Sequence, residues 1–254
     1  MDLIFVIILG GLWGSFANVC IYRLPMGKGV VSGRSFCPKC KKLITWKDNI
    51  PIISFLFLNG KCRSCKKKIS PKYLIVELIT IIYFLVVYYL FGISISTLLF
   101  LFLGLSFVII FFIDLKHFII PNVLTFSLMI VGFVKSFDPN LNQSLFPNYI
   151  NSLIGGLFGY AIIWLIIFFY KTLRNKEGMG LGDAKLIAVV GFWFGWFSIP
   201  FTIFISSVVA LVYSIPSLMN KSRDFSTQIP FGPFIIIGCL IYVTFANQIK
   251  TLFP

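Results

Sequence analysis

Residues 95–114 read ISTLLFLFLGLSFVIIFFID, an apolar run that ends on a single carboxylate, Asp114. A second stretch, Gly178-Met179-Gly180-Leu181-Gly182-Asp183, places another aspartate at the edge of another apolar segment. An ionisable residue at the end of a membrane segment is costly to keep there, so each acid is a candidate functional residue. The rest of the sequence indicates whether the two belong to one site.

The composition is that of an integral membrane protein. Of the 254 residues, 58% are hydrophobic and 12% charged, and the mean hydropathy is +0.96, whereas a soluble domain carries about 25% charged residues. A bilayer-spanning helix needs about 20 mostly apolar residues. Eight segments of this character, some of them short, cover 3–22, 73–91, 95–113, 118–134, 150–170, 184–198, 200–218 and 232–249. We therefore expect an all-α polytopic membrane protein with about eight transmembrane helices.

The distribution of Lys and Arg sets the orientation, because these residues collect in cytoplasmic loops. If residues 23–72 are cytoplasmic, alternation puts all 22 Lys and Arg residues on that side except Lys135 and Lys250. Both termini then lie outside, and Asp114 and Asp183 fall at similar depth near the cytoplasmic face. The net charge of +14 is explained by this bias and by anionic lipid head groups, so we expect a lipid bilayer and no nucleic acid as partner.

Three parts follow from this topology. The first segment lacks a basic n-region and a clear cleavage site, so it is expected to remain as a helix, residues 1–22. Residues 23–72 form a small cytoplasmic domain, which is too short to build a strong hydrophobic core without a stabilising cross-link such as a disulfide or a bound metal. Residues 73–254 form a seven-helix membrane domain. No internal repeat is apparent.

Four cysteines could supply this cross-link. Cys37-Pro-Lys-Cys40 and Cys62-Arg-Ser-Cys65 have the spacing of two knuckles that give four thiolates to a tetrahedral zinc. The cytosol is reducing, which disfavours disulfides, and bound metal would supply folding energy. We predict structural zinc; a metal-free loop and redox-active dithiols are the alternatives. Cys20 and Cys239 lie in apolar segments and are expected to be small buried residues.

The two aspartates suggest a catalytic pair. Two carboxylates close together cannot both ionise easily, so one keeps a proton. Such a pair can activate water with one member and protonate a leaving amine with the other, which is the chemistry of peptide hydrolysis. Gly180 and Gly182 beside Asp183 would let a substrate backbone approach closely.

Structural alternatives remain open from the residues alone. Asp183 could be a first-turn acid that caps a helix. Asp114 could pair with Lys116 or Lys185 at the membrane interface. Glu77, near the start of the second apolar helix, could pair with a lysine or serve a site, and the sequence does not decide.

Taken together, these motifs resemble those of the bacterial type IV prepilin peptidases, also called prepilin leader peptidases or N-methyltransferases, which are G-x-G-D membrane aspartic proteases. The resemblance spans nearly the whole chain. It rests on Gly14–Pro25, the two cysteine pairs with Trp46–Pro51 between them, Ile69–Leu78, Asp114 with Ile120-Pro121-Asn122, Gly180–Asp183 with Lys185, and Pro230-Phe231-Gly232-Pro233.

The resemblance implies that the chain removes the short basic leader of prepilins and pseudopilins, after a glycine, at the cytoplasmic face of the inner membrane. Asp114 and Asp183 carry over as the catalytic pair. The supporting motif residues are Gly180, Gly182, Lys185, Pro121, Pro230, Gly232 and Pro233. It further implies methylation of the new N-terminus with S-adenosylmethionine, although no residue pattern here indicates where this donor binds.

Two other functions remain as alternatives. The chain could be a peptidase only, with a purely structural zinc domain, because family members without the cysteines exist. A transporter or membrane scaffold with a zinc clip would instead favour paired broken helices, which the sequence lacks. We also hypothesise that Asp48 or Glu177 holds the basic residues of the leader.

Overall fold

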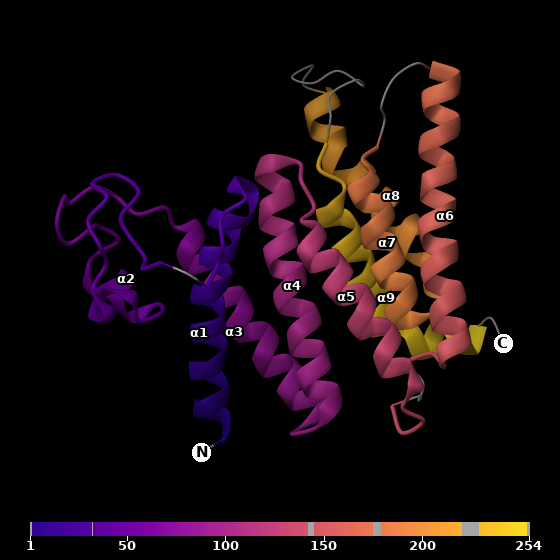
Figure 1. Ribbon diagram of the computed structural model, residues 1–254, viewed down its shortest axis with the longest axis horizontal. Helices are drawn as coiled ribbons and strands as arrows, with labels where there is room; N and C mark the ends of the chain where they lie inside the picture. The colour runs from indigo at the N-terminus through magenta and orange to yellow at the C-terminus, as the bar shows by residue number, and fades with distance from the viewer. Residues whose placement is uncertain (1, 32, 142–144, 175–178, 220–228, 253–254) are drawn as a thin grey trace. The chain divides into compact units, whose positions relative to one another are not determined.

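The computed structural model describes residues 2–31, 33–141, 145–174, 179–219 and 229–252 (Figure 1). Over these residues the chain is helical, and extended pairing is limited to the isolated bridges Phe36–Leu43 and Lys61–Lys68. The expected all-α class is therefore confirmed.

Nine α-helices form in the described residues. They are α1 (Asp2–Arg23), α2 (Ile53–Phe57), α3 (Lys72–Phe91), α4 (Ile95–His117), α5 (Asn122–Val134), α6 (Tyr149–Arg174), α7 (Leu181–Phe194), α8 (Ser198–Met219) and α9 (Gly232–Leu252). Each of the eight expected apolar segments forms a helix, but only α1, α3, α4, α6, α8 and α9 have membrane length. With 13 and 14 residues, α5 and α7 are about 20 Å long, against about 30 Å of bilayer hydrocarbon.

The junction between α4 and α5 departs from the expected boundaries. The sequence predicted a helix from residue 118, whereas α5 begins at Asn122. Phe118 adopts a left-handed φ of 55° and donates its N–H to the Asp114 carbonyl at 3.0 Å, which ends α4. Pro121 then disfavours helical backbone at Ile120. As a result, Asp114 lies inside the last turn of α4 and not after it.

The chain divides into two compact units, Met1–Ile113 and Asp114–Pro254, with the division inside α4. In the first unit α1 packs along α3 (Figure 1). Gly10 and Gly14 make this possible, because a methyl group added to Gly14 would lie 2.8 Å from the Glu77 Cα. Small residues permit such close helix contacts in membranes. The boundaries expected at residues 22 and 72 stay predictions.

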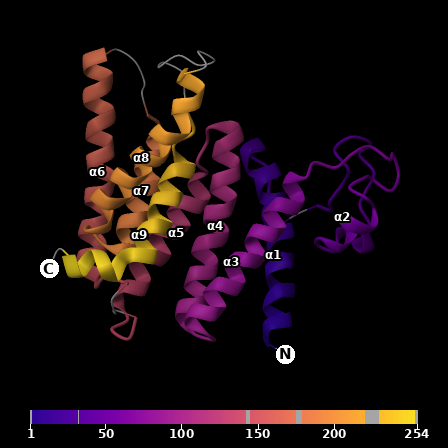
Figure 2. The same cartoon turned by 180° about the vertical axis from the view of Figure 1, so that it is seen from behind.

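In the second unit α7 is the central helix. It packs against α5, α6, α8 and α9 (Figures 1 and 2), and ten of its 14 residues are buried. A methyl group added to Gly191 would overlap the Gly155 carbonyl of α6, so these two helices meet backbone to backbone. Because protein and not lipid surrounds α7, this helix does not need the length of a bilayer-spanning helix.

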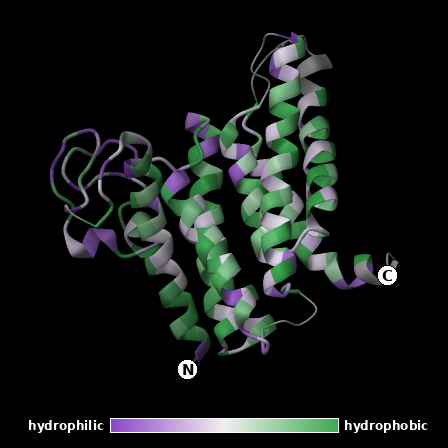
Figure 3. Cartoon of the chain, turned by 45° about the vertical axis from the view of Figure 1, so that its right-hand side comes forward, coloured by the Kyte–Doolittle hydropathy of each residue, from purple (hydrophilic) through white to green (hydrophobic). Residues whose placement is uncertain are grey.

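Hydropathy follows the helices. The helix shafts are mostly hydrophobic, and hydrophilic residues gather in the segment between α1 and α3 and at helix ends (Figure 3). Large apolar side chains such as Leu98 and Phe204 remain exposed on helix surfaces. With no water in the hydrocarbon of a bilayer, helices with such surfaces suit lipid. The chain is a multi-pass membrane protein.

Lys135, expected outside the membrane, is buried in the second unit at 6% exposure. Its Nζ donates to the Trp193 carbonyl at 3.0 Å and stands 3.7 Å from the centre of the Phe146 ring. A desolvated ammonium over an aromatic ring makes a cation–π interaction worth about 2 kcal/mol. Lys135 therefore fastens the α5 end to the C-terminal end of α7.

Candidate active site and metal centre

Asp114 is held by the start of α9. Its side chain is buried at 4% exposure, and its Oδ2 accepts the N–H of Gly232 at 3.0 Å. A methyl group added to Gly232 would lie 2.7 Å from that oxygen. Glycine is thus required here so that the backbone can approach the carboxylate.

Asp183 occupies the first turn of α7 and is 8% exposed. Its Oδ2 accepts the N–H of Gly180 at 3.3 Å, so it does cap the helix start. A carboxylate at a helix N-terminus is also stabilised by the helix dipole. The capping interaction does not isolate this acid, because Asp183 also interacts electrostatically with Asp114.

Ile120 joins the surroundings of the two acids. The turn at Phe118 directs Ile120 into the second unit, where it is 8% exposed. Its Cδ1 would lie 3.2 Å from a methyl group on Gly232 and 3.4 Å from one on Gly182. Since Gly232 holds Asp114 and Gly182 precedes Asp183, one isoleucine contacts the backbone beside both carboxylates.

The remaining motif residues support this site without pairing with the acids. Lys185 donates to the Asn122 side-chain oxygen at 2.8 Å and so connects α7 to the start of α5. Pro121 precedes the first residue of α5. Pro230 precedes α9, and Pro233 lies in its first turn, where proline is well accommodated. Among the described residues, neither aspartate forms a salt bridge.

The four cysteines of the predicted metal site come together in the first unit. All four Sγ atoms lie within 4.8 Å of one another, and those of Cys37 and Cys65 are 4.0 Å apart. A tetrahedron with Zn–S bonds of about 2.3 Å places its sulfurs about 3.8 Å apart. The donor set and spacing therefore fit a zinc ion. Cys20 and Cys239 are buried elsewhere, as expected.

The two cysteine loops repeat one local structure. In each loop the N–H of the first cysteine donates to the carbonyl five residues later. The residue after the second cysteine has a positive φ, and its N–H donates to the carbonyl of the first cysteine. The pairs are Cys37 to Lys42 and Lys41 to Cys37, then Cys62 to Lys67 and Lys66 to Cys62. The expectation of no internal repeat was therefore wrong for this segment, where the letters C-x-x-C-K-K occur twice. In the second loop, N–H groups of Cys65 and Ser64 lower the pKa of the Cys62 thiol to about 7.

Glu77 holds the segment between the cysteine pairs to α3. Its side chain is 9% exposed, and its Oε2 accepts the N–H of Ile52 at 2.8 Å. Ile52 has a φ of 60°, which is strained for a β-branched residue. The sequence left the partner of Glu77 open; it is a backbone amide 25 positions away.

Asp48 is paired within its own domain. Arg63 donates to both of its carboxylate oxygens, at 2.7 to 3.0 Å. This hydrogen bonding to Arg63 lowers the pKa of Asp48. We therefore do not assign Asp48 to the leader. Glu177, the other residue of that hypothesis, and Gly178 lie outside the described residues.

Comparisons with known proteins match this arrangement. Residues 8–91 match the model of the bacterial peptidase A24 N-terminal domain, and residues 98–215 match that of the type IV leader peptidase family. The chain is 34% identical to a prepilin leader peptidase/N-methyltransferase of Pseudomonas aeruginosa, over 96% of this chain and 90% of that protein. The chain belongs to the type IV leader peptidase family. Relatives of the same name from Neisseria gonorrhoeae and Vibrio cholerae are 36% and 34% identical, over 93% and 94% of this chain and 88% and 95% of theirs.

The two matched domains of this leader peptidase contain different candidate sites. The N-terminal match holds all four cysteines, and the second match holds Asp114 and Asp183. Gly232 lies beyond both matches; the sequence motif predicts a supporting role for it, and its hydrogen bond identifies Asp114 as its partner. No solved structure matches this chain.

A graded glycine series tests the geometry of this leader peptidase site. Gly232→Ala is expected to lower the rate of leader cleavage at least 10-fold, because its methyl group displaces Asp114. Gly180→Ala should change the rate less than 3-fold, since the nearest atom to its methyl group would be 3.8 Å away. The cleavage rates of the two purified variants are measured on one prepilin. Equal losses of rate in both variants would contradict the expected order.

Proposed function

We propose that this chain is an aspartic endopeptidase that removes the basic leader from prepilins and pseudopilins at the cytoplasmic face of the bacterial inner membrane. One observation carries the proposal. Two buried carboxylates each accept a glycine N–H, and Ile120 packs beside the glycines next to both. Family membership supports the same activity.

The proposed reaction divides the work between the two acids. The ionised carboxylate takes a proton from water, which attacks the carbonyl of the scissile peptide, and the protonated partner gives its proton to the leaving amine. The N–H groups of Gly180 and Gly232 fix the carboxylates in place.

We also propose that the chain methylates the new N-terminal amine, as the names of its relatives suggest for those proteins. The methyl donor would be S-adenosylmethionine, which carries a methyl group on a positively charged sulfur. Cys37, Cys40, Cys62 and Cys65 would hold a structural zinc that folds the domain between α1 and α3.

The test is a two-product assay. Purified protein is incubated with a full-length prepilin and S-adenosylmethionine labelled in the methyl group. We expect a pilin that has lost its leader and carries label on its new N-terminus. Cleavage without label would indicate a peptidase only. The absence of both products would overturn the proposed function in favour of a transporter or scaffold.

Ile120 offers a prediction about substrate choice. Its side chain fills the space beside Gly182 and Gly232, so a substrate with a side chain before the scissile bond would collide with it. Ile120→Ala is expected to reduce the preference for glycine over alanine at that position by at least 10-fold. Ratios of kcat/KM on the two prepilins measure it. Ile187→Ala, at a fully buried isoleucine of α7, is the control, and an equal change in both variants would refute the prediction.

A further inference from the structure

The apolar loop, residues 49–60 between the two cysteine pairs, reads NIPIISFLFLNG and contains no charged residue. The sequence predicts that it belongs to a cytoplasmic domain. Yet the large apolar side chains of Ile53, Leu56 and Phe57 are exposed, that of Phe57 at 83%. A contiguous apolar patch of this kind marks a contact with a membrane or with another protein. None of the sites described above uses it.

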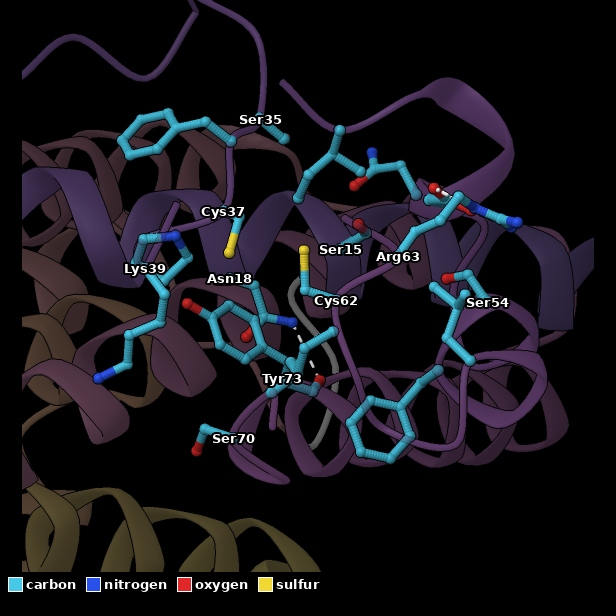
Figure 4. A pocket seen from close by; sticks show the side chains of 18 of the residues that line it. Ser15, Asn18, Ser35, Cys37, Lys39, Ser54, Cys62, Arg63, Ser70 and Tyr73 are labelled. Atoms are coloured by element: carbon cyan, nitrogen blue, oxygen red, sulfur yellow. Dashed lines mark hydrogen bonds and ion pairs between the residues drawn. The ribbon is translucent and has the colours of Figure 1, made fainter. Parts of the chain in front are cut away.

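The apolar loop has one face toward its own domain and one face away from it. Ser54 and Phe55 line a cavity together with the two cysteine loops (Figure 4). The exposed side chains at 53, 56 and 57 share the other face of α2, because positions three and four apart lie on one side of a helix. Trp46 extends this face, since Trp46, Ile53 and Phe57 line one hollow on the surface.

Within the first unit, the apolar loop lies beside α1 and not beyond its end (Figures 1 and 2). A methyl group added to Gly11 would stand 3.3 Å from the Cβ of Pro51. Gly11 lies about 18 Å before Arg23, the last residue of α1, at the helical rise of about 1.5 Å per residue. One leaflet contributes about 15 Å of hydrocarbon, half of the bilayer core. With Arg23 at the head groups, Pro51 lies at the depth of the acyl chains.

The backbone of the loop is suited to this depth. In hydrocarbon, N–H and C=O groups need partners within the protein. The N–H groups of Ser54, Leu56 and Leu58 donate to carbonyls four positions earlier at 3.0 to 3.1 Å. The Ile52 N–H, at the position with a φ of 60°, donates to the buried Glu77 carboxylate. Glu77 thereby satisfies an amide that the short helix α2 leaves outside its own hydrogen bonds.

Charge stands at the base of the loop and not at its tip. Arg63 donates to both carboxylate oxygens of Asp48 at 2.7 to 3.0 Å, which joins the two ends of the loop. Beside this pair, the Lys47 ammonium stands 5.6 Å from the centre of the Trp46 ring. Tryptophan is enriched at the membrane–water interface. The cysteine loops on both sides are rich in lysine, which anionic head groups attract.

We propose that the apolar loop enters the leaflet in which α1 ends, as a re-entrant loop with lipid as its partner. Ile53, Leu56 and Phe57 lie among the acyl chains, and Trp46 lies at the head groups. Lipid is the partner that the position favours, because Leu12, the neighbour of Gly11, is an exposed residue of the same membrane-length helix. The loop anchors the domain with the four cysteines to the membrane.

Labelling of the wild-type protein by lipid tests the proposal without any substitution. The full-length protein is placed in nanodiscs of phosphatidylethanolamine and phosphatidylglycerol, with a trace of phosphatidylcholine that carries a photoreactive diazirine on its acyl chain. Trypsin releases residues 48–61 as one peptide, because Lys47 and Lys61 bound it. We expect label in this peptide and in α1, and none in the cysteine loops. An unlabelled 48–61 peptide would overturn the proposal.

A charge at the tip should drive the loop out of the lipid. Phe57→Asp is expected to reduce the label in residues 48–61 roughly 10-fold, because a carboxylate is costly among acyl chains. Phe57→Leu is the matched control, which keeps an apolar side chain and should be labelled as the wild type is. The Phe57 side chain is mostly exposed, so neither substitution removes a core contact. Equal labelling of the two variants would contradict insertion.

A photoreactive side chain at position 57 identifies what covers the loop. p-Benzoylphenylalanine replaces Phe57 in one variant, Leu12 in a second and Lys39 of the first cysteine loop in a third. Position 57 should form lipid adducts about as often as position 12 and roughly 10-fold more often than position 39, since acyl chains surround only the first two. Adducts with a second copy of this chain, or with added prepilin in place of lipid, would overturn the assignment and indicate a protein interface.

Discussion

Asp114→Asn and Asp183→Asn should each lower leader cleavage about 10²- to 10⁴-fold, the range that general acid–base groups contribute. Asparagine keeps the size of the side chain and an oxygen for the N–H groups of Gly232 and Gly180. The substitutions therefore remove the proton chemistry and leave the local contacts in place. Initial rates on a purified prepilin measure the effect.

The double variant distinguishes a pair from two separate acids. Residues that act as a unit are strongly non-additive, so Asp114→Asn with Asp183→Asn should be about as slow as the slower single variant. Asp138→Asn, an aspartate outside the site, is the control and should cleave normally. Loss of activity in only one of the two single variants would contradict the proposed pair.

The second largest effect is expected in the first unit, when one ligand of the proposed zinc site is removed. Cys62→Ser is expected to lower zinc from about one ion per chain to nearly none. Structural zinc contributes about 10–16 kcal/mol in small zinc domains, so residues 23–72 should become sensitive to limited proteolysis. Methyl transfer should be lost when residues 23–72 unfold. Elemental analysis, tryptic digestion and the labelled-methyl assay measure the three effects.

Leader cleavage should be affected less by Cys62→Ser, because Asp114 and Asp183 both lie in the second compact unit. The matched control is Cys239→Ser, a buried cysteine away from the cluster, which should retain its zinc. Full zinc occupancy in the Cys62→Ser variant would exclude this cysteine as a ligand.

Several features were predictable because the bilayer and local spacing impose them. A run such as residues 95–113 must form a helix in lipid, where every backbone group needs an internal partner. Two C-x-x-C pairs give the knuckle spacing directly. Lysine counting predicts that Asp114 and Asp183 lie at one depth, because positive charge is retained on the cytoplasmic side, and this orientation stays a prediction. These signals lie within single segments of the chain.

The tertiary structure decided what depends on packing between distant segments. Gly232 reaches Asp114 across 118 positions, and Ile120 contacts the surroundings of both acids only because Phe118 reverses the chain. Glu77 meets Ile52, and Lys135 meets Trp193. The sequence by itself determined the helices, the cysteine knuckles and the two candidate acids. Only the fold decided their partners, because a polar group bonds to whatever the packed backbone brings within about 3 Å of it.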